Sequence, residues 1–424
     1  MHMTDILNAQ LLEATRLTNA GRLTEATAVL QRVLGRGRAT PGAAPFVTPP
    51  AARRAPPTLE GMAEPDELTP DKDAPRPGTT PGSGGSVFFG EAAEAAMPDA
   101  LRSLLARGGS GKFRMPGGLP AGLSPGAPQV PVPPGAQFLA ARFGNEAGTR
   151  PYKLYVPSGY RPGRPVPLVV MLHGCTQSPD DFAVGTRMND AAETHTCLVA
   201  YPGQTGSANM QKCWNWFSEG DQHRGRGEPS LIAGITLEVM RDYAVDSQRV
   251  YVAGLSAGGA AAAIMGDAYP DLFAAIGVHS GLACGAARDV QSAFAAMQGS
   301  GTVTVRSGRA QRVVPAIVFH GDRDSTVNPR NADAVVAQSG RAATLTKHVE
   351  QGRAPGGHTY TRTLSVDPSG RTVVEQWVVH GAKHAWFGGS AAGSYTDPHG
   401  PDATSEMLRF FLEHPHPASG PRPG

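Results

Sequence analysis

The fold of this chain is indicated by residues 250–260, which read Val-Tyr-Val-Ala-Gly-Leu-Ser-Ala-Gly-Gly-Ala. An apolar run typical of a buried strand leads into the pattern G-x-S-x-G at residues 254–258, and an alanine-rich run typical of a helix follows it. The two glycines allow the strand and the helix to approach closely around a strained turn, which lifts the Ser256 hydroxyl above the sheet edge. The pattern predicts a nucleophile elbow, and the alternative is a glycine-rich turn with an exposed serine.

The chain around this motif alternates between strand-like and helix-like patterns. Continuous apolar runs, of which 168–172 is the clearest, are typical of parallel strands that are covered on both faces. The alternation predicts a doubly wound, mostly parallel α/β domain over residues 136–415, with its active site at the carboxyl ends of the strands. The expected strands are 137–143, 152–156, 167–173, 197–201, 249–253, 273–279, 316–320 and 372–379, and the clearest helical patterns are 230–243 and 257–268.

The N-terminal third of the chain has a different composition. Helical spacing of leucine and other apolar residues predicts a small helical hairpin at residues 1–35. Residues 36–135 hold 19 of the 38 prolines, and such a stretch cannot bury enough apolar surface to offset its ordering entropy. We therefore expect a largely disordered linker there, and a disordered tail at residues 416–424.

The composition and the motifs of the chain exclude several classes of function. The formal net charge of +2 gives no electrostatic reason to expect binding to nucleic acid. No apolar run is long enough to span a membrane, and the N-terminus lacks the pattern of a secretory signal. The patterns of zinc peptidases, P-loop proteins and dinucleotide-binding domains are also missing, so we expect no metal and no dinucleotide cofactor.

The candidate nucleophile requires a base, and the base requires an orienting acid. In α/β-hydrolases these residues occur in the chain order serine, acid, histidine. Downstream of Ser256 an apolar strand runs into a polar turn that holds two aspartates, of which Asp324 is the expected acid and Asp322 the alternative. Either aspartate could instead cap backbone amides of the turn. The expected base is His384, in a glycine-bounded loop after the last strand, whereas His380 still belongs to the end of that strand.

The remaining site residues are expected in two loops. The backbone N–H groups of Ala257, directly after the serine, and of Cys175, in the loop after an early strand, are the expected oxyanion donors. Cys175 could also form a disulfide with Cys213, which the sequence leaves open. The expected substrate-binding residues are Trp214, Trp216 and Trp386, with core packing as the alternative for Trp214 and Trp216.

Five motifs in order resemble the polyhydroxybutyrate depolymerase family of esterases, and more narrowly the short-chain-length polyhydroxyalkanoate depolymerases with catalytic domain type 1. They are MLHGCTQ at 171–177, CWNWF at 213–217, GLSAGG at 254–259, HGDRD at 320–324 and GAKHAW at 381–386. The resemblance covers residues 136–413. It implies an α/β-hydrolase fold and hydrolysis of poly(3-hydroxybutyrate) or related polyesters by a serine esterase with Ser256, Asp324 and His384 as its triad.

The resemblance leaves alternatives for substrate, activity and location. Feruloyl and acetylxylan esterases belong to the same family, and a non-catalytic granule-binding protein is a second alternative. Secreted members carry a signal peptide and often a substrate-binding module, whereas this chain begins with the predicted hairpin and linker. We therefore expect a cytoplasmic protein that can attach to polyhydroxyalkanoate storage granules through its N-terminal region, with an extracellular location as the alternative.

Overall fold

A computed structural model describes residues 128–300, 314–340 and 344–417 of the chain. The predicted hairpin at 1–35 and most of the predicted linker lie outside the described residues. The part of the linker that is described runs from residue 128 into the first strand, and the Val130 side chain there packs against the core. At the other end, the backbone N–H of His416 donates to the carbonyl of Gln248 at 2.8 Å.

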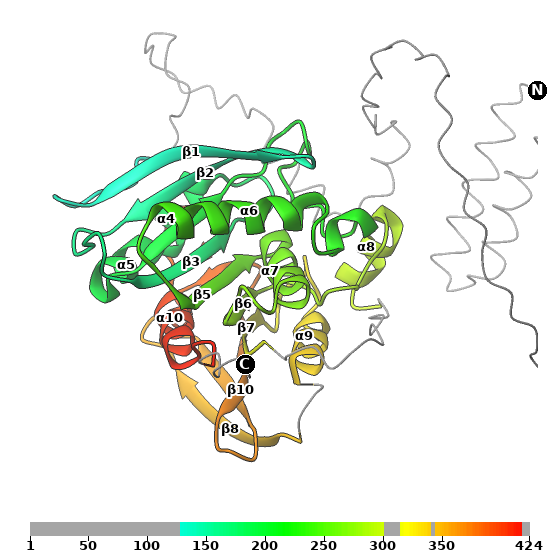
Figure 1. Cartoon of the computed structure of the whole chain (residues 1–424). Helices are drawn as coiled ribbons and strands as arrows, with labels where there is room; N and C mark the ends of the chain where they lie inside the picture. The colour runs from blue at the N-terminus through cyan, green and yellow to red at the C-terminus, as the bar shows by residue number, and fades with distance from the viewer. Residues whose placement is uncertain (1–127, 301–313, 341–343, 418–424) are drawn as a thin grey trace, which may run out of the picture. The chain divides into compact units, whose positions relative to one another are not determined.

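The described residues form a ten-stranded sheet in the order β1-β2-β4-β3-β5-β6-β7-β10-β9-β8 (Figure 1). Strands β4, β3, β5, β6, β7 and β10 are parallel, and antiparallel pairs close both edges. This is the doubly wound α/β arrangement that the alternating pattern predicts. The bounds are β1 Gln137–Asn145, β2 Gly148–Val156, β3 Val166–Leu172, β4 Leu198–Pro202, β5 Val245–Leu255, β6 Ala275–His279, β7 Ala316–Gly321, β8 Thr346–Arg353, β9 Thr359–Val366 and β10 Thr372–Val379.

Helices cover both faces of the sheet. Their bounds are α4 Pro179–Thr186, α5 Met188–His195, α6 Gly227–Asp242, α7 Ala257–Ala268, α8 Val290–Met297, α9 Arg330–Gly340 and α10 Ala403–Glu413, with a short 3₁₀ turn, η2, at Glu219–Gln222. One core cluster contains apolar residues of α6, α7, α8 and α9, and a second contains those of α4, α5 and α10. A small parallel pair, β11 Trp386–Phe387 with β12 Thr396–Asp397, lies outside the main sheet.

Strand β3 accounts for the continuous apolar run in the sequence. Leu168 and Leu172 belong to the first core cluster, whereas the intervening Val169 and Met171 belong to the second. Successive side chains of a strand point to opposite faces, so a strand with a core on each side is apolar at every position. Each fully buried leucine or valine of this kind contributes roughly 1.5–3 kcal/mol to folding.

Strands β8 and β9 were not among the strands expected from the sequence. The sequence of β8 is Thr-Lys-His-Val-Glu-Gln-Gly-Arg, and nearly all of its residues are exposed. It forms the outer edge of the sheet beside β9, at the bottom of the view in Figure 1. Polar side chains on an edge strand prevent pairing with other chains, and they also remove the apolar pattern by which strands are recognised.

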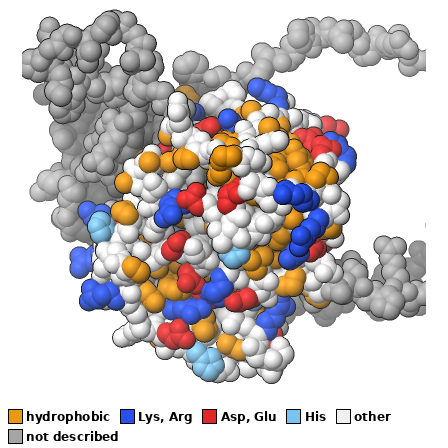
Figure 2. Space-filling view, turned by 90° about the vertical axis from the view of Figure 1, so that its left-hand side faces the viewer, with side chains coloured by type: hydrophobic (Ala, Val, Ile, Leu, Met, Phe, Trp, Pro, Cys, Tyr) orange, Lys and Arg blue, Asp and Glu red, His pale blue; other side chains and the backbone are white. Residues whose placement is uncertain are grey.

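The surface carries charges of both signs. On the face drawn in Figure 2, acidic and basic side chains are interspersed among apolar ones. This distribution agrees with a formal net charge of only +2 for the whole chain.

Candidate active site

Ser256 lies in the tight turn between β5 and α7. Its backbone is strained, with φ 58° and ψ −119°. A Cβ atom on Gly258 would lie 2.0 Å from the Leu172 carbonyl oxygen, and one on Gly254 would lie 2.3 Å from the Gly258 backbone. Only glycine therefore allows β5, α7 and the end of β3 to meet this closely, which is the physical reason for the G-x-S-x-G pattern.

The predicted acid and base are directly hydrogen-bonded to each other. His384 Nδ1 donates to Asp324 Oδ2 at 2.7 Å. The Asp324 side chain is fully buried, and its Oδ1 accepts from the backbone N–H groups of Thr326 at 2.8 Å and Val327 at 2.9 Å. His320 Nε2 lies 3.4 Å from Oδ2 on the other side. The Asp324 carboxylate is therefore held in one orientation by several donors.

The pKa of Asp324 results from opposing effects. Burial acts to raise the pKa, but the charge of His384 and the hydrogen bonds from His320 and His384 outweigh it. The net pKa of Asp324 lies well below its ordinary value. Asp324 is therefore ionised at neutral pH and can stabilise a protonated imidazole at His384.

The alternative acid, Asp322, pairs with a different histidine. Asp322 Oδ2 accepts from His380 Nδ1 at 3.0 Å, and its Oδ1 accepts from the Gly381 N–H at 2.7 Å. Both side chains of this pair are more than one third exposed. The structure therefore brings Asp324, and not Asp322, to His384.

The sheet register brings the predicted nucleophile and acid to one edge. Leu255 of β5 is the register partner of His279 in β6, which in turn is the partner of Phe319 in β7. Strand β10 continues this row across the sheet. The chain leaves the sheet at Ser256 directly after the row, and Asp324 follows shortly after it, so both lie at carboxyl ends of parallel strands, β5 and β7, that are separated only by β6.

The hydroxyl of Ser256 does not cap helix α7. Among the hydrogen bonds of the described residues, none joins Ser256 Oγ to His384 Nε2. In unliganded enzymes this contact is often long and tightens when the substrate is bound.

The two expected oxyanion donors lie beside the serine. The first N–H groups of a helix have no acceptor within the helix, and Ala257 is the first residue of α7. In the loop after β3, a Cβ atom on Gly174 would lie 3.6 Å from the Ser256 Cβ. No acceptor for the Cys175 N–H is found within residues 128–300, 314–340 and 344–417. Both N–H groups are thus free to bind a ligand near the hydroxyl.

A disulfide joins Cys175 to Cys213, the pairing that the sequence left open. It fastens the loop after β3 to the segment that follows β4, and the N–H of Thr176 also donates to the Gln211 carbonyl in that segment at 2.6 Å. The other two cysteines among the described residues, Cys197 and Cys284, are buried and are not part of a disulfide. The candidate donor Cys175 is therefore held both by a covalent bond and by its neighbour.

The buried side chain of His173 hydrogen-bonds to the same loop after β3. His173 Nε2 accepts from the Gln204 N–H at 3.0 Å, so its Nδ1 carries the proton and donates to the Gly174 carbonyl at 2.7 Å. Burial lowers the pKa of His173 to about 4, and this outweighs the opposing hydrogen bond to Gly174. His173 is therefore neutral at physiological pH.

Glu228 holds the segment that carries Cys213. Its carboxylate accepts from the N–H of Asn215 at 2.7 Å, from the Asn215 side chain at 2.8 Å and from the Gln204 side chain, and it pairs with Arg150 at 3.3 Å. Burial raises the pKa of this carboxyl group. Through these contacts Glu228 holds the segment around Asn215 in place.

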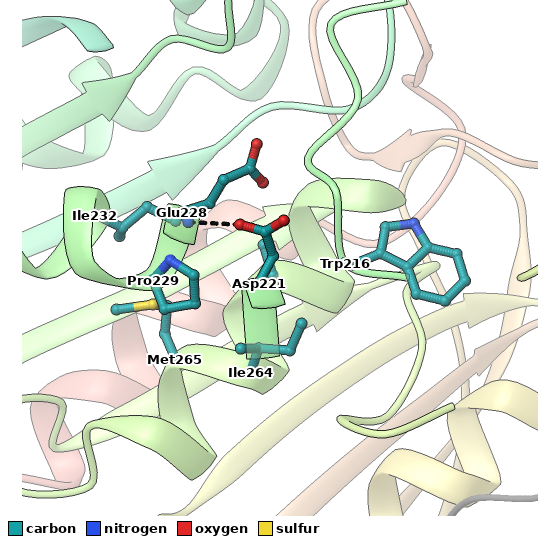
Figure 3. A pocket seen from close by; sticks show the side chains of 8 residues that line it. Trp216, Asp221, Glu228, Pro229, Ile232, Ile264 and Met265 are labelled. Carbon is teal, nitrogen blue, oxygen red and sulfur yellow. Dashed lines mark hydrogen bonds between the residues drawn. The ribbon is translucent and has the colours of Figure 1, made fainter. Parts of the chain in front are cut away.

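A small pocket lies beside this segment, at the start of α6 (Figure 3). The Glu228 N–H donates to Asp221 Oδ1 at 2.7 Å at its rim, as the dashed line shows. The pocket contains no triad candidate. It is lined by Trp216, Asp221, Glu228, Pro229, Ile232, Ala261, Ile264 and Met265.

The tryptophans predicted to bind substrate are buried. Trp214 is 1% exposed, Trp216 6% and Trp386 0%. The Trp386 ring packs edge-on against Phe182 at 5.5 Å, and its Nε1 donates to Thr404 Oγ1 at 3.0 Å. This burial leaves little or no accessible ring surface for a substrate, so the predicted binding role is replaced by core packing. The misleading signal was the position of these residues beside catalytic motifs.

Comparison with known proteins identifies the family. Residues 150–361, half of the chain, match the family described as Esterase PHB depolymerase. The chain belongs to this family. The poly(3-hydroxyalkanoate) depolymerase C of Paucimonas lemoignei is 31% identical over 254 residues, covering 58% of this chain and 60% of that protein. A probable acetylxylan esterase A of Neosartorya fischeri is 30% identical over 228 residues, covering 49% of this chain and 60% of that protein.

The chain spans about 60% of the length of these two family members. Among solved structures, the acetyl xylan esterase from Aspergillus awamori aligns with a TM-score of 0.50 and 19% identity, covering 66% of this chain and 99% of that chain. At this identity the similarity concerns the fold alone, which is therefore the α/β-hydrolase fold expected from the motifs.

Among the residues that the structure describes, no group of three or more His, Cys, Asp and Glu side chains is arranged to hold a metal ion. None of the helices in the same ranges is long and apolar enough to cross a membrane.

Proposed function

We propose that this chain is a carboxylic ester hydrolase that acts through an acyl-enzyme on Ser256. The observation that carries the proposal is the hydrogen-bonded pair of His384 and Asp324 at the sheet edge where the strained Ser256 is partly exposed. A serine at such a turn, with a base and a buried acid nearby, is the arrangement that nucleophilic acyl transfer requires. Membership in an esterase family supports the same chemistry.

Each group has one role in the proposed reaction. His384 takes the proton of Ser256 Oγ as the oxygen attacks the ester carbonyl, and ionised Asp324 stabilises the resulting imidazolium. The N–H groups of Ala257 and Cys175 bind the oxyanion, each lowering the barrier by roughly 3 kcal/mol. His384 then returns the proton to the leaving alkoxide, and water releases the acyl group by the same steps in reverse order.

As substrate we propose poly(3-hydroxybutyrate) or a related short-chain polyhydroxyalkanoate. Relatives named as depolymerases of such polymers support this, including the poly(3-hydroxybutyrate) depolymerase of Ralstonia pickettii, 28% identical over 243 residues. A second support is Met210, whose side chain is 72% exposed. It directly precedes Gln211, which binds the loop of the oxyanion donor. An exposed thioether in the segment next to the oxyanion-donor loop suits contact with an apolar polymer chain.

The second candidate is an acetylxylan or feruloyl esterase. It is favoured by relatives with those names, among them the feruloyl esterase B of Thermothelomyces thermophilus, 28% identical over 232 residues. The proposed ester hydrolysis is the same for both candidates. They differ in which ester substrate the surface around Ser256 binds. A non-catalytic granule-binding protein is the remaining alternative, and it would need neither the strained serine nor the buried acid.

The disulfide favours an extracellular location, which the sequence analysis gave as the alternative to the cytoplasm. Disulfides persist in oxidising compartments and are rare in the cytoplasm. A bridge between Cys175 and Cys213 therefore supports a location outside the cytoplasm over attachment to cytoplasmic granules. Binding of polymer surfaces by the N-terminal region remains part of the proposal in either compartment.

The full-length protein and its Ser256→Ala variant test the function together. We expect the substitution to lower hydrolysis of p-nitrophenyl butyrate more than about 1,000-fold with an unchanged circular dichroism spectrum, because the nucleophile is lost. Ser369→Ala, in the turn before β10, is the matched control and should keep full activity. Substantial turnover by Ser256→Ala would refute the proposal.

Assays of the same two proteins on different esters distinguish the two candidate substrates. Release of 3-hydroxybutyrate from amorphous polymer, compared with release of ferulate and of acetate from acetylated xylan, identifies the preferred ester. We expect the polymer to be preferred, and a higher kcat/KM for either plant ester would assign the second candidate instead.

A further inference from the structure

His279 is a buried histidine that the sequence analysis did not single out. It is the last residue of β6, the strand between those that lead to the predicted nucleophile and to the predicted acid. Its side chain is 0% exposed. A buried histidine at the centre of a catalytic sheet edge needs hydrogen-bond partners, and these partners identify its role.

The backbone and the ring of His279 bind two different parts of the site. Its carbonyl oxygen accepts from the Ser256 N–H at 2.9 Å. Its Nε2 accepts from the N–H of Phe387 at 3.1 Å, and Phe387 lies in β11, directly after the loop of His384. Since Nε2 accepts from an amide, Nδ1 carries the proton and donates to Ser280 Oγ at 3.1 Å.

Aromatic rings hold the imidazole of His279 in this orientation. Trp386 and Phe319 stack on it at 5.0 and 5.6 Å, and Phe387 meets it edge-on at 4.4 Å. Phe319 lies in β7, on the strand that leads to the acid, whereas the other two rings follow His384. The ring of His279 therefore contacts the segments of the acid and the base, and its backbone carbonyl contacts the turn of the nucleophile.

The ring of His279 is also kept uncharged. Burial, followed by the nearby His320 and His384, lowers its pKa well below the ordinary value. The groups that face it are these two histidines and Asp324, which acts in the opposite direction. A neutral ring keeps its lone pair for the Phe387 N–H while His384 gains and loses its proton.

We propose that His279 is a positioning residue that sets the location of His384 relative to Ser256. It fixes the nucleophile turn through its carbonyl group and the loop of the base through its Nε2 atom. The inference rests on the proposed function. A base that is misplaced by 1 Å can lower the rate about 100-fold while substrate binding is unchanged.

The test compares His279→Gln with His279→Asn in the full-length protein. The oxygen of glutamine reaches the place of Nε2 and can accept from the Phe387 N–H, whereas the shorter asparagine cannot reach it. With p-nitrophenyl butyrate, we expect His279→Asn to lose at least tenfold in kcat with KM within twofold. We expect His279→Gln to recover most of that loss.

A second readout does not depend on turnover. The proton between His384 Nδ1 and Asp324 should give a low-field proton NMR signal, and we expect His279→Asn to shift or broaden it and His279→Gln to restore it. If Ser256→Ala keeps its activity, the proposed function fails, but this signal still tests the positioning role.

The matched control is His414→Asn. His414 is 2% exposed, stacks on Phe410 at 4.0 Å, and hydrogen-bonds to the carbonyls of Phe410 in α10 and of Thr372, the first residue of β10, at the opposite end of that strand from the loop of His384. We expect His414→Asn to lower stability without changing kcat or the low-field signal. The positioning role is overturned if His279→Asn keeps kcat within twofold, if its loss equals that of His414→Asn, or if glutamine rescues nothing.

Discussion

Asp324 and Asp322 illustrate how environment separates two identical side chains that lie two positions apart. Asp324 is buried and accepts hydrogen bonds from His384 and from backbone N–H groups of its own turn. Asp322 is exposed and pairs with His380. A buried carboxylate with a depressed pKa holds an imidazole in one tautomer, whereas an exposed pair contributes little to stability or orientation.

This contrast predicts different effects for the same substitution. Asp324→Asn preserves the shape of the acid but removes its charge, and we expect kcat for p-nitrophenyl butyrate to fall about 1,000- to 10,000-fold. Asp322→Asn, the matched control, should change kcat less than twofold. Initial rates of both variants at saturating ester check this. Equal losses would mean that the acid has been assigned wrongly.

At the level of the elements, the site is an assembly of turns that are locked to one another. The turn of Ser256 packs on the end of β3 through Gly254 and Gly258, and the loop after β3 is bound to Cys213 by the disulfide. Neither loop has a regular hydrogen-bond ladder of its own. The position of the Cys175 N–H therefore depends on the covalent bond and on the buried groups beneath it.

Removing the disulfide should affect both catalysis and stability. Its two cysteines are 38 positions apart, and closing a loop of that length stabilises a fold by at most about 4 kcal/mol. We expect the double variant Cys175→Ser, Cys213→Ser to unfold at lower urea and to lose kcat at least tenfold, because an oxyanion donor becomes mobile.

Reduction provides the control for this prediction. Dithiothreitol should lower the activity of the wild-type protein but leave that of the double variant unchanged, since the buried Cys197 and Cys284 form no bridge. Alkylation and mass spectrometry of protein from its producing cells should find two reactive cysteines after unfolding. Four reactive cysteines would show that the disulfide does not form in these cells. The cytoplasm would then be the proposed location.

At the level of the whole molecule, buried neutral histidines make stability depend on pH. His173 has a pKa of about 4 in the fold and an ordinary value of 6.5 when unfolded. Between these values the unfolded chain binds a proton that the folded chain does not, so stability is present above pH 6.5 and falls as the pH decreases toward 4. A shift of this size corresponds to about 3 kcal/mol.

We therefore expect the free energy of unfolding to decrease between pH 7 and pH 4.5. Urea unfolding of the wild-type protein and of His173→Gln at both values measures this, because glutamine can accept from the Gln204 N–H but does not titrate. The variant should show a smaller decrease. An equal decrease in both proteins would exclude His173 as a source of the pH dependence.

Reading along the chain was sufficient for the features that depend on neighbours in sequence. The parallel core was recognisable because strands such as β3 are apolar at every position, and the turn at Ser256 was recognisable because its glycines are required by its own geometry. The expected acid and base were separated from Asp322 and His380 by their places after strands, and in the structure Asp324 is hydrogen-bonded to His384, and Asp322 to His380.

Other features were decided only when distant segments came together. Burial converted Trp214 and Trp386 from candidate binding residues into core residues, and it gave His279 contacts to three segments of the site. The pairing of Cys175 with Cys213 and the edge hairpin of β8 and β9 depend in the same way on what lies beside them in space. A local sequence pattern indicates which chemistry a residue is capable of. Its exposure and its hydrogen-bond partners are determined only when the chain is packed.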